Sequence, residues 1–242
     1  MSRAVTHIHT EHSWDGTVSV PRLASMLIER GIELAVVSDH NSFAGSLELR
    51  ALIERDHLPL RAPVAAEIRT DLGDVLVAFE DGTPPEVDRL LRWDDLQRVV
   101  RERGGLIWLP HPYRSHTNVE AIAAGADVIE VFNGRCSPAE DASALELCGR
   151  HGATPAYGAD LHRPNELNLV VAEYEDRPTI LETLRGTPRC PTPRRTRKSD
   201  IMAAEVINGI KRRRPTLVGY FGLKWVKHRA LEVTGRVPRE DG

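Results

Sequence analysis

Short apolar runs alternate with longer amphipathic stretches along most of this chain, and this alternation restricts its fold more than any other feature. Eight runs predict β-strands, at residues 4–9, 34–40, 63–70, 74–79, 106–111, 128–133, 155–160 and 169–174. Helices are predicted between them, at residues 20–31, 42–56, 84–105 and 137–152. Strands that alternate with helices form parallel βαβ units. About seven such units in fewer than 190 residues predict a compact α/β barrel rather than an open sheet.

The ends of the predicted helices carry residues typical of helix boundaries. The helix at 20–31 has a proline near its start and a glycine at its end, and Ser42 is a suitable N-cap for the helix at 42–56. The stretch at 84–105 is long, amphipathic and closed by two glycines, so we expect one continuous helix there.

Several classes of protein lack support in this sequence. No G-x-G-x-x-G follows a predicted strand and no P-loop motif occurs, which argues against dinucleotide and P-loop nucleotide binding. No apolar run is long enough to span a membrane, and the first residues do not resemble a secretory signal. Cys136, Cys148 and Cys190 are odd in number and have no C-x-x-C spacing. We therefore expect a cytoplasmic protein whose cysteines stay reduced.

Charge divides the chain into two parts. Residues 1–188 hold 18 Lys and Arg against 30 Asp and Glu, a net charge of -12, whereas residues 189–242 hold 14 against 5, a net charge of +9. We expect a barrel domain at 1–188 and a basic extension at 189–242, with a linker at 189–199 and short helices at 200–214 and 222–233. The extension could dock on the acidic barrel or be a solvated helix face. Alternatively, it could bind phosphate, nucleic acid or anionic lipid.

Polar side chains capable of metal binding or catalysis follow the predicted strands. Alternation along the first strand places His7 and His9 on one face. The other strand-end residues are Asp39, His40, Glu67, His111, Glu130, Asn133, Asp160 and His162. In parallel barrels the carboxyl ends of the strands meet at one mouth, where catalytic residues lie. We therefore expect these residues to converge.

Imidazoles and carboxylates together are typical ligands of divalent transition metals, and this set exceeds the needs of one ion. Two or three ions about 3.5–4 Å apart would suit the hydrolysis of a phosphate ester. A single histidine at a strand end is more often structural than metal-binding. If all of these residues were structural, however, polar residues would have to stand at the end of strand after strand by chance. His57, His116, His151 and His228 lack such placement and are interpreted as structural. His12 is interpreted as a candidate that orients a ligand.

Six segments, in this order, resemble the motifs of the PHP family, the polymerase and histidinol phosphatase superfamily. They read "HIHTEHSWDG", "SDHN", "AAEI", "LPHP", "IEVFNGR" and "GADLH", and the resemblance covers about residues 3–185. It implies a distorted (βα)7 barrel of TIM-like form with a trinuclear metal centre. It also implies metal-dependent phosphoesterase activity.

The resemblance also implies a set of metal ligands: His7, His9, Glu67 and Asp160 at one ion, Asp15, His40 and His162 at a second, and His111 with Glu67 at a third. Asp74 takes a place where many family members carry another histidine. A carboxylate there favours a harder ion such as Mn²⁺, so we expect two or three ions of Zn, Mn or Fe.

Arginines that follow the motifs are candidate phosphate clamps, because a guanidinium can bind two phosphate oxygens at once. Arg114 and Arg135 are the stronger candidates, and Arg69 and Arg163 the weaker ones. The predicted catalytic set is therefore His7, His9, Glu67, Asp160, Arg114 and Arg135.

Three functions compete. The first is a metal-dependent phosphoesterase acting on a small phosphomonoester or on a nucleic acid, which the basic extension would favour. The second is an amidohydrolase, but no lysine precedes Lys198, which largely excludes the version with a bridging lysine. The third is a metal-stabilised binding or regulatory module without turnover. The sequence predicts no oligomeric state.

Overall fold

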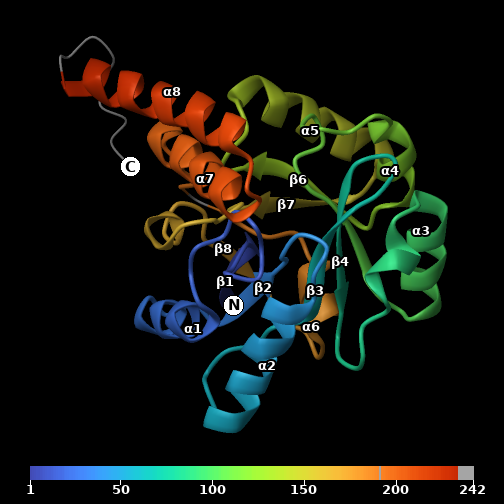
Figure 1. The fold of residues 1–242 in the computed structure, drawn as a ribbon. Helices are drawn as coiled ribbons and strands as arrows, with labels where there is room; N and C mark the ends of the chain where they lie inside the picture. The colour runs from blue at the N-terminus through green and yellow to red at the C-terminus, as the bar shows by residue number, and fades with distance from the viewer. Residues whose placement is uncertain (191, 234–242) are drawn as a thin grey trace.

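The computed structural model describes residues 1–190 and 192–233, and in these residues the strands and helices alternate as predicted (Figure 1). The strands are β1 (Ser2–Ile8), β2 (Leu34–Val37), β3 (Val64–Arg69), β4 (Asp74–Phe79), β5 (Leu106–Leu109), β6 (Val128–Asn133), β7 (Thr154–Gly158) and β8 (Ala172–Tyr174). Each expected strand is therefore present, with ends that differ by a few residues.

The strands form two sheets, in the orders β2-β1-β8 and β3-β4-β5-β6-β7. Isolated bridges join the sheets on both sides: His40 pairs with Glu67 next to β2 and β3, and Ile8 pairs with Leu161 next to β1 and β7. The fold is thus mixed α/β. The closed seven-stranded barrel is not shown, because the hydrogen-bond ladders of the two sheets remain separate.

The expectation of parallel units throughout was wrong at β4. Residues 70–73 join β3 to β4 in a turn closed by a hydrogen bond from the amide of Thr70 to the carbonyl oxygen of Gly73 (2.8 Å), and four residues leave no room for a crossover helix. The pairs β3–β4 and β4–β5 are therefore antiparallel. The expectation was also wrong at β8, which pairs with β1 in the antiparallel direction. Because β4 runs in the opposite direction, Asp74 at its start lies opposite Arg69 at the end of β3.

Helices surround the sheets in both views. They are α1 (Val20–Glu29), α2 (Ala44–Asp56), α3 (Trp93–Glu102), α4 (Val119–Gly125), α5 (Pro138–His151) and α6 (Ile180–Leu184), with 3-10 turns at Val87–Leu90 and Pro164–Glu166.

One detail of the predicted helices was wrong, and a second holds with a shifted boundary. The stretch at 84–105 is interrupted at Leu91 and Arg92, because the amide of Trp93 donates to the side chain of Asp71 (2.8 Å) and α3 begins anew there. Ser42 lies one residue before the assigned N-cap Phe43, but its Oγ accepts a hydrogen bond from the amide of Ala44 (3.2 Å), the first residue of α2, as a capping serine does. This detail therefore differs only in where the helix boundary is drawn.

The hydrophobic core has a layer on each face of the sheet, as β5 illustrates. Ile107 and Leu109 pack with Val100 of α3 in the outer layer. Trp108 is fully buried on the opposite face, where it packs with Val128 of β6. Strands buried on both faces explain why their sequences are almost continuously apolar.

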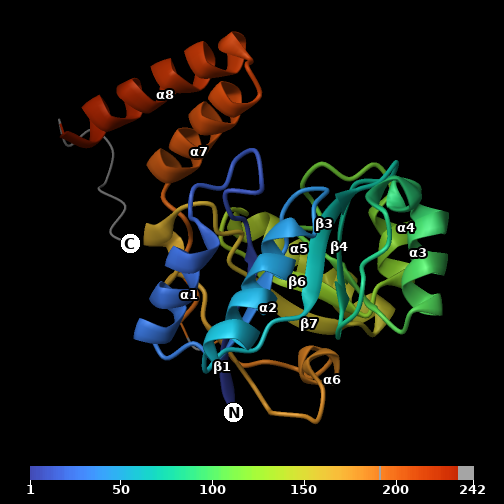
Figure 2. The same cartoon turned by 60° about the horizontal axis from the view of Figure 1, so that its bottom comes forward.

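The basic extension forms a helical hairpin of α7 (Lys198–Lys211) and α8 (Pro215–Val233), which agrees with two predicted helices, although α7 starts and ends earlier than predicted and α8 starts seven residues earlier. Gly209 permits their close approach, since a Cβ there would lie 2.9 Å from Cγ2 of Val218. The hairpin rises from the rest of the molecule (Figure 2), and α8 points away from the sheets. Within the described residues, no helix combines the length and hydrophobicity needed to cross a bilayer. Residue 191 of the predicted linker lies outside the described residues.

Candidate metal centre

His7 and His9 lie side by side, as the sequence predicts, but a simple alternating strand does not place them there. The register of β1 against β2 shifts between Val5 and Ile8, and His7 has a left-handed backbone with φ of 61°. Both side chains are completely buried, and their ring centroids are 5.1 Å apart.

His111 and Asp160 have the same unusual backbone as His7, with φ of 27° and 49°. The three residues come from the ends of β1, β5 and β7, and their ligand atoms gather in one group. A left-handed backbone at a non-glycine residue costs on the order of 1–3 kcal/mol and is typical of functional sites. The fold therefore holds all three in an unfavourable conformation at one place.

Glu67, at the end of β3, lies at the centre of the histidines and is completely buried. Its carboxylate oxygens lie 3.0–3.4 Å from Nε2 of His7, His9 and His111 and Nδ1 of His40. One carboxylate thus faces four imidazoles, and all five side chains belong to groups that could hold a metal ion.

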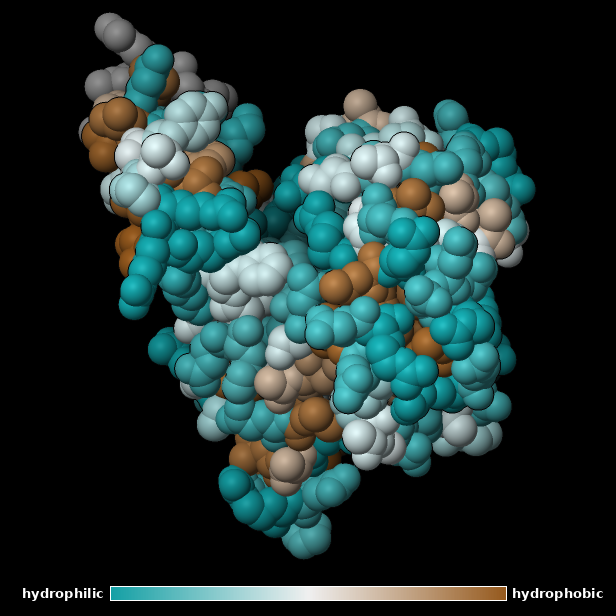
Figure 3. Space-filling model, turned by 45° about the vertical axis from the view of Figure 1, so that its right-hand side comes forward, coloured by the Kyte–Doolittle hydropathy of each residue, from teal (hydrophilic) through white to brown (hydrophobic). Residues whose placement is uncertain are grey.

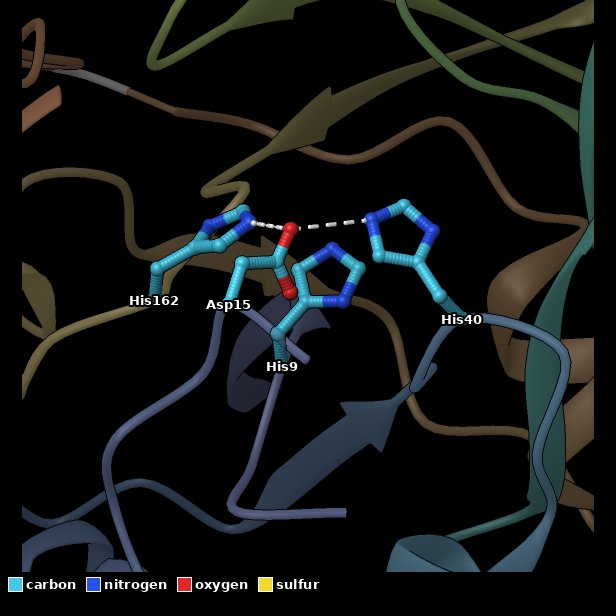
Figure 4. Close-up of side chains that lie close together, drawn as sticks. All are labelled: His9, Asp15, His40 and His162. Atoms are coloured by element: carbon cyan, nitrogen blue, oxygen red, sulfur yellow. Dashed lines mark ion pairs between the residues drawn. The ribbon is translucent and has the colours of Figure 1, made fainter. Parts of the chain in front are cut away.

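A second group joins His9, His40 and His162 to Asp15, which lies in the loop after β1 (Figure 4). One oxygen of Asp15 is 3.2 Å from Nε2 of His40 and 3.1 Å from Nε2 of His162. The ligand atoms of the four residues lie within 4.8 Å of one another. The resemblance had implied the other three ligands together, and the structure adds His9 to them.

Two more groups contain Glu67, which lies with His7 and His9 in one and with His40 and Asp74 in the other. Asp74 also forms an ion pair with Arg69. Burial, together with the charge of Glu67, raises the pKa of Asp74 to about 6. Asp74 is the one residue that sets its group apart from the others, and it is also the position at which the sequence departs from the family.

Buried polar atoms without a hydrogen-bond partner also indicate that the residues of the centre fit divalent ions. Nε2 of His9 is buried and has no hydrogen-bond partner, although it lies 3.4 Å from Glu67 and 3.6 Å from Asp160. Asp15 Oδ1 and His111 Nδ1 are further buried atoms without a hydrogen-bond partner. Buried polar atoms are nearly always paired. Cations between these donors would supply the missing partners.

The electrostatics of the site follow from charges confined in a buried space. Burial alone lowers the pKa of His7, but the carboxylates of Glu130 and Glu67 outweigh it and hold that pKa well above its usual value. Burial lowers the pKa of His9, and His162 and His40 lower it further. His9 therefore carries a neutral imidazole, the form that binds a metal.

Glu130, one of the strand-end residues, lies behind His7 and supports it. Its Oε1 is 2.8 Å from Nδ1 of His7, and its Oε2 accepts hydrogen bonds from the amides of His111 (3.0 Å) and Asn133 (2.8 Å, side chain). A Cβ at Gly158 would lie 2.2 Å from Glu130 Oε1, which explains the glycine there. Glu130 orients the ring of His7 so that Nε2 faces Glu67 and Asp160.

The four candidate arginines differ in their partners. Arg114 donates to Asp160 (3.0 Å) and remains one-third exposed. Arg135 is buried and donates to the carbonyl oxygen of Asp160 (2.9 Å) and to Glu166 (3.3 Å), so it fixes Asp160. Arg69 pairs with Asp74, and Arg163 pairs with Asp200 of α7.

The remaining histidines lie outside the ligand groups. His12 pairs with Glu48 (2.6 Å) rather than with a candidate ligand. His116 donates through Nε2 to the carbonyl oxygen of Asp74 (2.8 Å). His57 ends α2, His151 pairs with Glu120, and His228 lies in α8.

The ligand groups open into a polar pocket of about 220 Å³. It is lined by Asp15, His40, Glu67, Asp74, His111, Asp160, His162, Arg69, Arg114, Arg135, Trp14, Ser115, Glu205, Asn208 and Arg212. Sequence reasoning missed the last three, which come from the end of α7, and it missed Trp14. Only the basic character of the extension and the position of Trp14 inside the first motif could have pointed to them.

Comparison with known proteins identifies relatives of unknown function. No family model matches the chain. The uncharacterized protein MJ1587 of Methanocaldococcus jannaschii is 26% identical over 144 residues, which are 54% of this chain and 81% of that protein. A second protein of the same organism, MJ0417, is 33% identical over 108 residues, which are 40% of this chain and 44% of that protein.

Solved structures share the fold. A two-domain protein of Bacteroides vulgatus, which contains a predicted PHP-like metal-dependent phosphoesterase, is similar with a TM-score of 0.55 at 16% identity, over 71% of this chain and 57% of that one. PsfC of Pseudomonas syringae gives 0.57 at 14% identity over 88% and 99%. An amidohydrolase of Chromobacterium violaceum, with bound sulfate and no metal, gives 0.52 at 17% identity over 79% and 93%.

Proposed function

We propose that this chain, whose fold is that of the PHP-like metal-dependent phosphoesterases, hydrolyses phosphate esters with two or three divalent metal ions. The observation that carries the proposal is Glu67, a buried carboxylate within 3.4 Å of four imidazoles at the bottom of an arginine-lined pocket. Four protonated imidazoles around one buried carboxylate would repel one another, whereas neutral imidazoles there offer lone pairs that cations can bind.

The ligand groups divide the ions among them. His7, His111 and Asp160 would hold one, and the His9 group with Asp15 a second. His40, Glu67 and Asp74 would hold a third, for which Mn²⁺ is the better candidate because it has two carboxylates. Bound divalent ions acidify a water molecule and neutralise the charge that develops on phosphoryl oxygens.

The protein's own side chains position and neutralise the substrate. Arg114 lies at the pocket surface with donors besides the one that bonds Asp160, so it can bind a phosphoryl oxygen. Arg135 holds Asp160 in place from the buried side, and Glu130 does the same for His7. We therefore assign Arg114 to substrate binding and Arg135 to positioning.

The pocket favours a small phosphomonoester over a nucleic acid. Its volume is about 220 Å³, and residues of α7 form part of its wall. Part of the basic charge of the extension, which we had connected with nucleic acid, is directed at the rim itself, because Lys211 contacts the loop at 11–16. Binding of a 5′-phosphorylated oligonucleotide end remains the alternative within this proposal.

The amidohydrolase neighbour supports a second reaction on the same fold. That neighbour holds sulfate, an oxyanion of the same shape as phosphate, which fits the phosphoesterase proposal equally well. Since the first lysine of this chain is Lys198, in α7, no strand supplies a lysine to bridge ions. A metal-stabilised module without turnover is the third possibility.

The full chain should be screened with Mn²⁺ against phosphomonoesters, a phosphodiester, an oligonucleotide with a 5′-phosphate and N-acyl amides. We expect hydrolysis of monoesters and a loss of roughly 10³-fold or more in kcat for Glu67→Gln, because the bridging charge is removed. Glu48→Gln is the matched control, since Glu48 pairs with His12 outside the ligand groups. Metal binding without hydrolysis of any ester would contradict the proposal and favour the module, and cleavage of amides alone would favour the amidohydrolase.

A further inference from the structure

The end of α7 belongs to the pocket, although it lies in the basic extension. Glu205, Asn208 and Arg212 are spaced by three and four residues, so they lie on one face of the helix, and all three line the pocket. Figure 3 shows a hollow between the hairpin and the rest of the molecule. The extension therefore supplies a wall to the site.

Lys211 fixes this wall to the loop that carries Asp15. Its ammonium group donates to the carbonyl oxygens of Gly16 (2.6 Å) and Ser13 (2.9 Å) and lies 3.5 Å from that of Glu11. A single cation thus caps three carbonyl groups of one loop. The position of Arg212, the next residue, is consequently determined relative to the metal ligands.

Arg212 lies on top of a stack that ends at a candidate ligand. Its guanidinium lies over the ring of Trp14, 5.0 Å from the ring centroid, and Trp14 in turn stacks on His40 with centroids 4.4 Å apart and an interplanar angle of 3°. In the described part of the chain no ion pair engages this guanidinium, whereas Arg69 and Arg114 are paired with carboxylates. Arg212 is an exposed cation at the pocket with hydrogen-bond donors available.

The contacts of Arg212 determine what it can bind. It contacts Trp14 and, among the residues that the structure describes, forms no ion pair with a candidate ligand, so we assign it to the part of the substrate that lies beyond the phosphoryl group. It lies within reach of the leaving group. Glu205, whose charge would oppose an anion, is about 10 Å away along the helix and accepts a hydrogen bond from Asn208 (3.2 Å).

We propose that α7 forms the leaving-group side of the pocket, and that Arg212 binds a second anionic group, a carboxylate or a phosphate, on the substrate. This inference rests on the proposed function, and it names the class of substrate: a phosphate ester whose leaving group is itself an anion. Asn208 contributes an amide oxygen, since its nitrogen faces Glu205 and its Oδ1 has no partner. That oxygen can accept a hydrogen bond from the same leaving group.

Binding of phosphonates, which cannot be hydrolysed, tests the inference by calorimetry on the full Mn²⁺-loaded protein. The three probes are benzylphosphonate, para-(phosphonomethyl)benzoate and para-xylylene bisphosphonate. We expect the second anion to tighten binding about tenfold or more, because a hydrogen bond between charged groups replaces water. The probe that gains more identifies the anion as carboxylate or phosphate.

Arg212→Ala should abolish this gain and leave the binding of benzylphosphonate unchanged, and Arg212→Lys should restore part of it. Arg214→Ala removes the same charge two residues away, outside the residues that line the pocket, and should keep the gain. An equal loss for all probes in Arg212→Ala, or no gain in the wild type, would overturn the inference. Hydrolysis of phenyl phosphate by the same proteins tests the proposed function separately, because Arg212 is assigned to the leaving group and not to the scissile phosphate.

Discussion

Replacing Asp74 by Asn should remove the part of the folded protein's stability that comes from the ion at the Asp74 group, and leave the part that comes from the other ions. Asp74 belongs to a single ligand group, whereas His7, His9, His40 and Glu67 each belong to two. An ion at a concentration of 100 times its Kd stabilises the folded state by about 2.7 kcal/mol. For 242 residues, the entropy of unfolding is about 0.5 kcal/mol per degree. Each filled site should therefore raise Tm by about 5 °C.

The assay is thermal unfolding followed by circular dichroism, first with chelator and then with Mn²⁺, together with the metal content of the dialysed protein. The variant needs its own chelated baseline, because Asp74→Asn also breaks the ion pair with Arg69. We expect the Mn²⁺-induced rise in Tm to be about 5 °C smaller in the variant than in the wild type. Asp81→Asn, an exposed aspartate just beyond the other end of β4, should behave as the wild type. An unchanged rise would refute a third ion at Asp74, and loss of the entire rise would refute separable groups.

Two further predictions concern residues around the ligands. Glu130→Gln keeps an acceptor for Nδ1 of His7 but removes the charge, so the affinity for metal should fall about 10- to 100-fold. Titration against a fluorescent chelator measures this affinity. An unchanged affinity would contradict the supporting role of Glu130. Burial and the neighbouring His111 lower the pKa of His116 to about 4. As the pH falls, His116 is therefore protonated in the unfolded chain before it is protonated in the folded protein. The stability due to neutral His116 is complete above pH 6.5 and declines toward pH 4. In the presence of chelator, the free energy of unfolding measured with urea should therefore fall by about 2 kcal/mol more in the wild type than in His116→Gln between pH 7 and pH 5. An equal pH dependence of the two proteins would exclude the effect.

The positions of most candidate ligands could be predicted because strand ends are visible in the sequence. Short apolar runs ended in His9, His40, Glu67, His111 and Asp160, and strands that share a sheet bring their ends together. The sequence does not reveal the left-handed backbone of His7, since that depends on pairing with strands distant in the chain. The side-by-side arrangement was right, although its cause was not simple alternation.

The direction of β4 could have been predicted, because four residues between two strands form a hairpin and not a crossover. The docking of α7 could not. Lys211 is fixed by backbone carbonyl groups of the loop at 11–16, and every residue carries such a group, so no pattern of side chains marks the partner. The positive charge of the extension indicated only that it would bind an acidic or electronegative surface.

The turn at 70–73 has a consequence for how such a centre can change over time. Arg69 and Asp74 flank this one turn, Glu67 lies farther back in β3, and the other candidate ligands come from separate strands and loops. A short insertion or deletion there would shift both side chains in register and leave the remaining ligands in place. A change in this short segment can therefore alter the metal preference of the Asp74 group alone. Among related proteins, differences in the number of bound ions should accordingly be found most often at this hairpin.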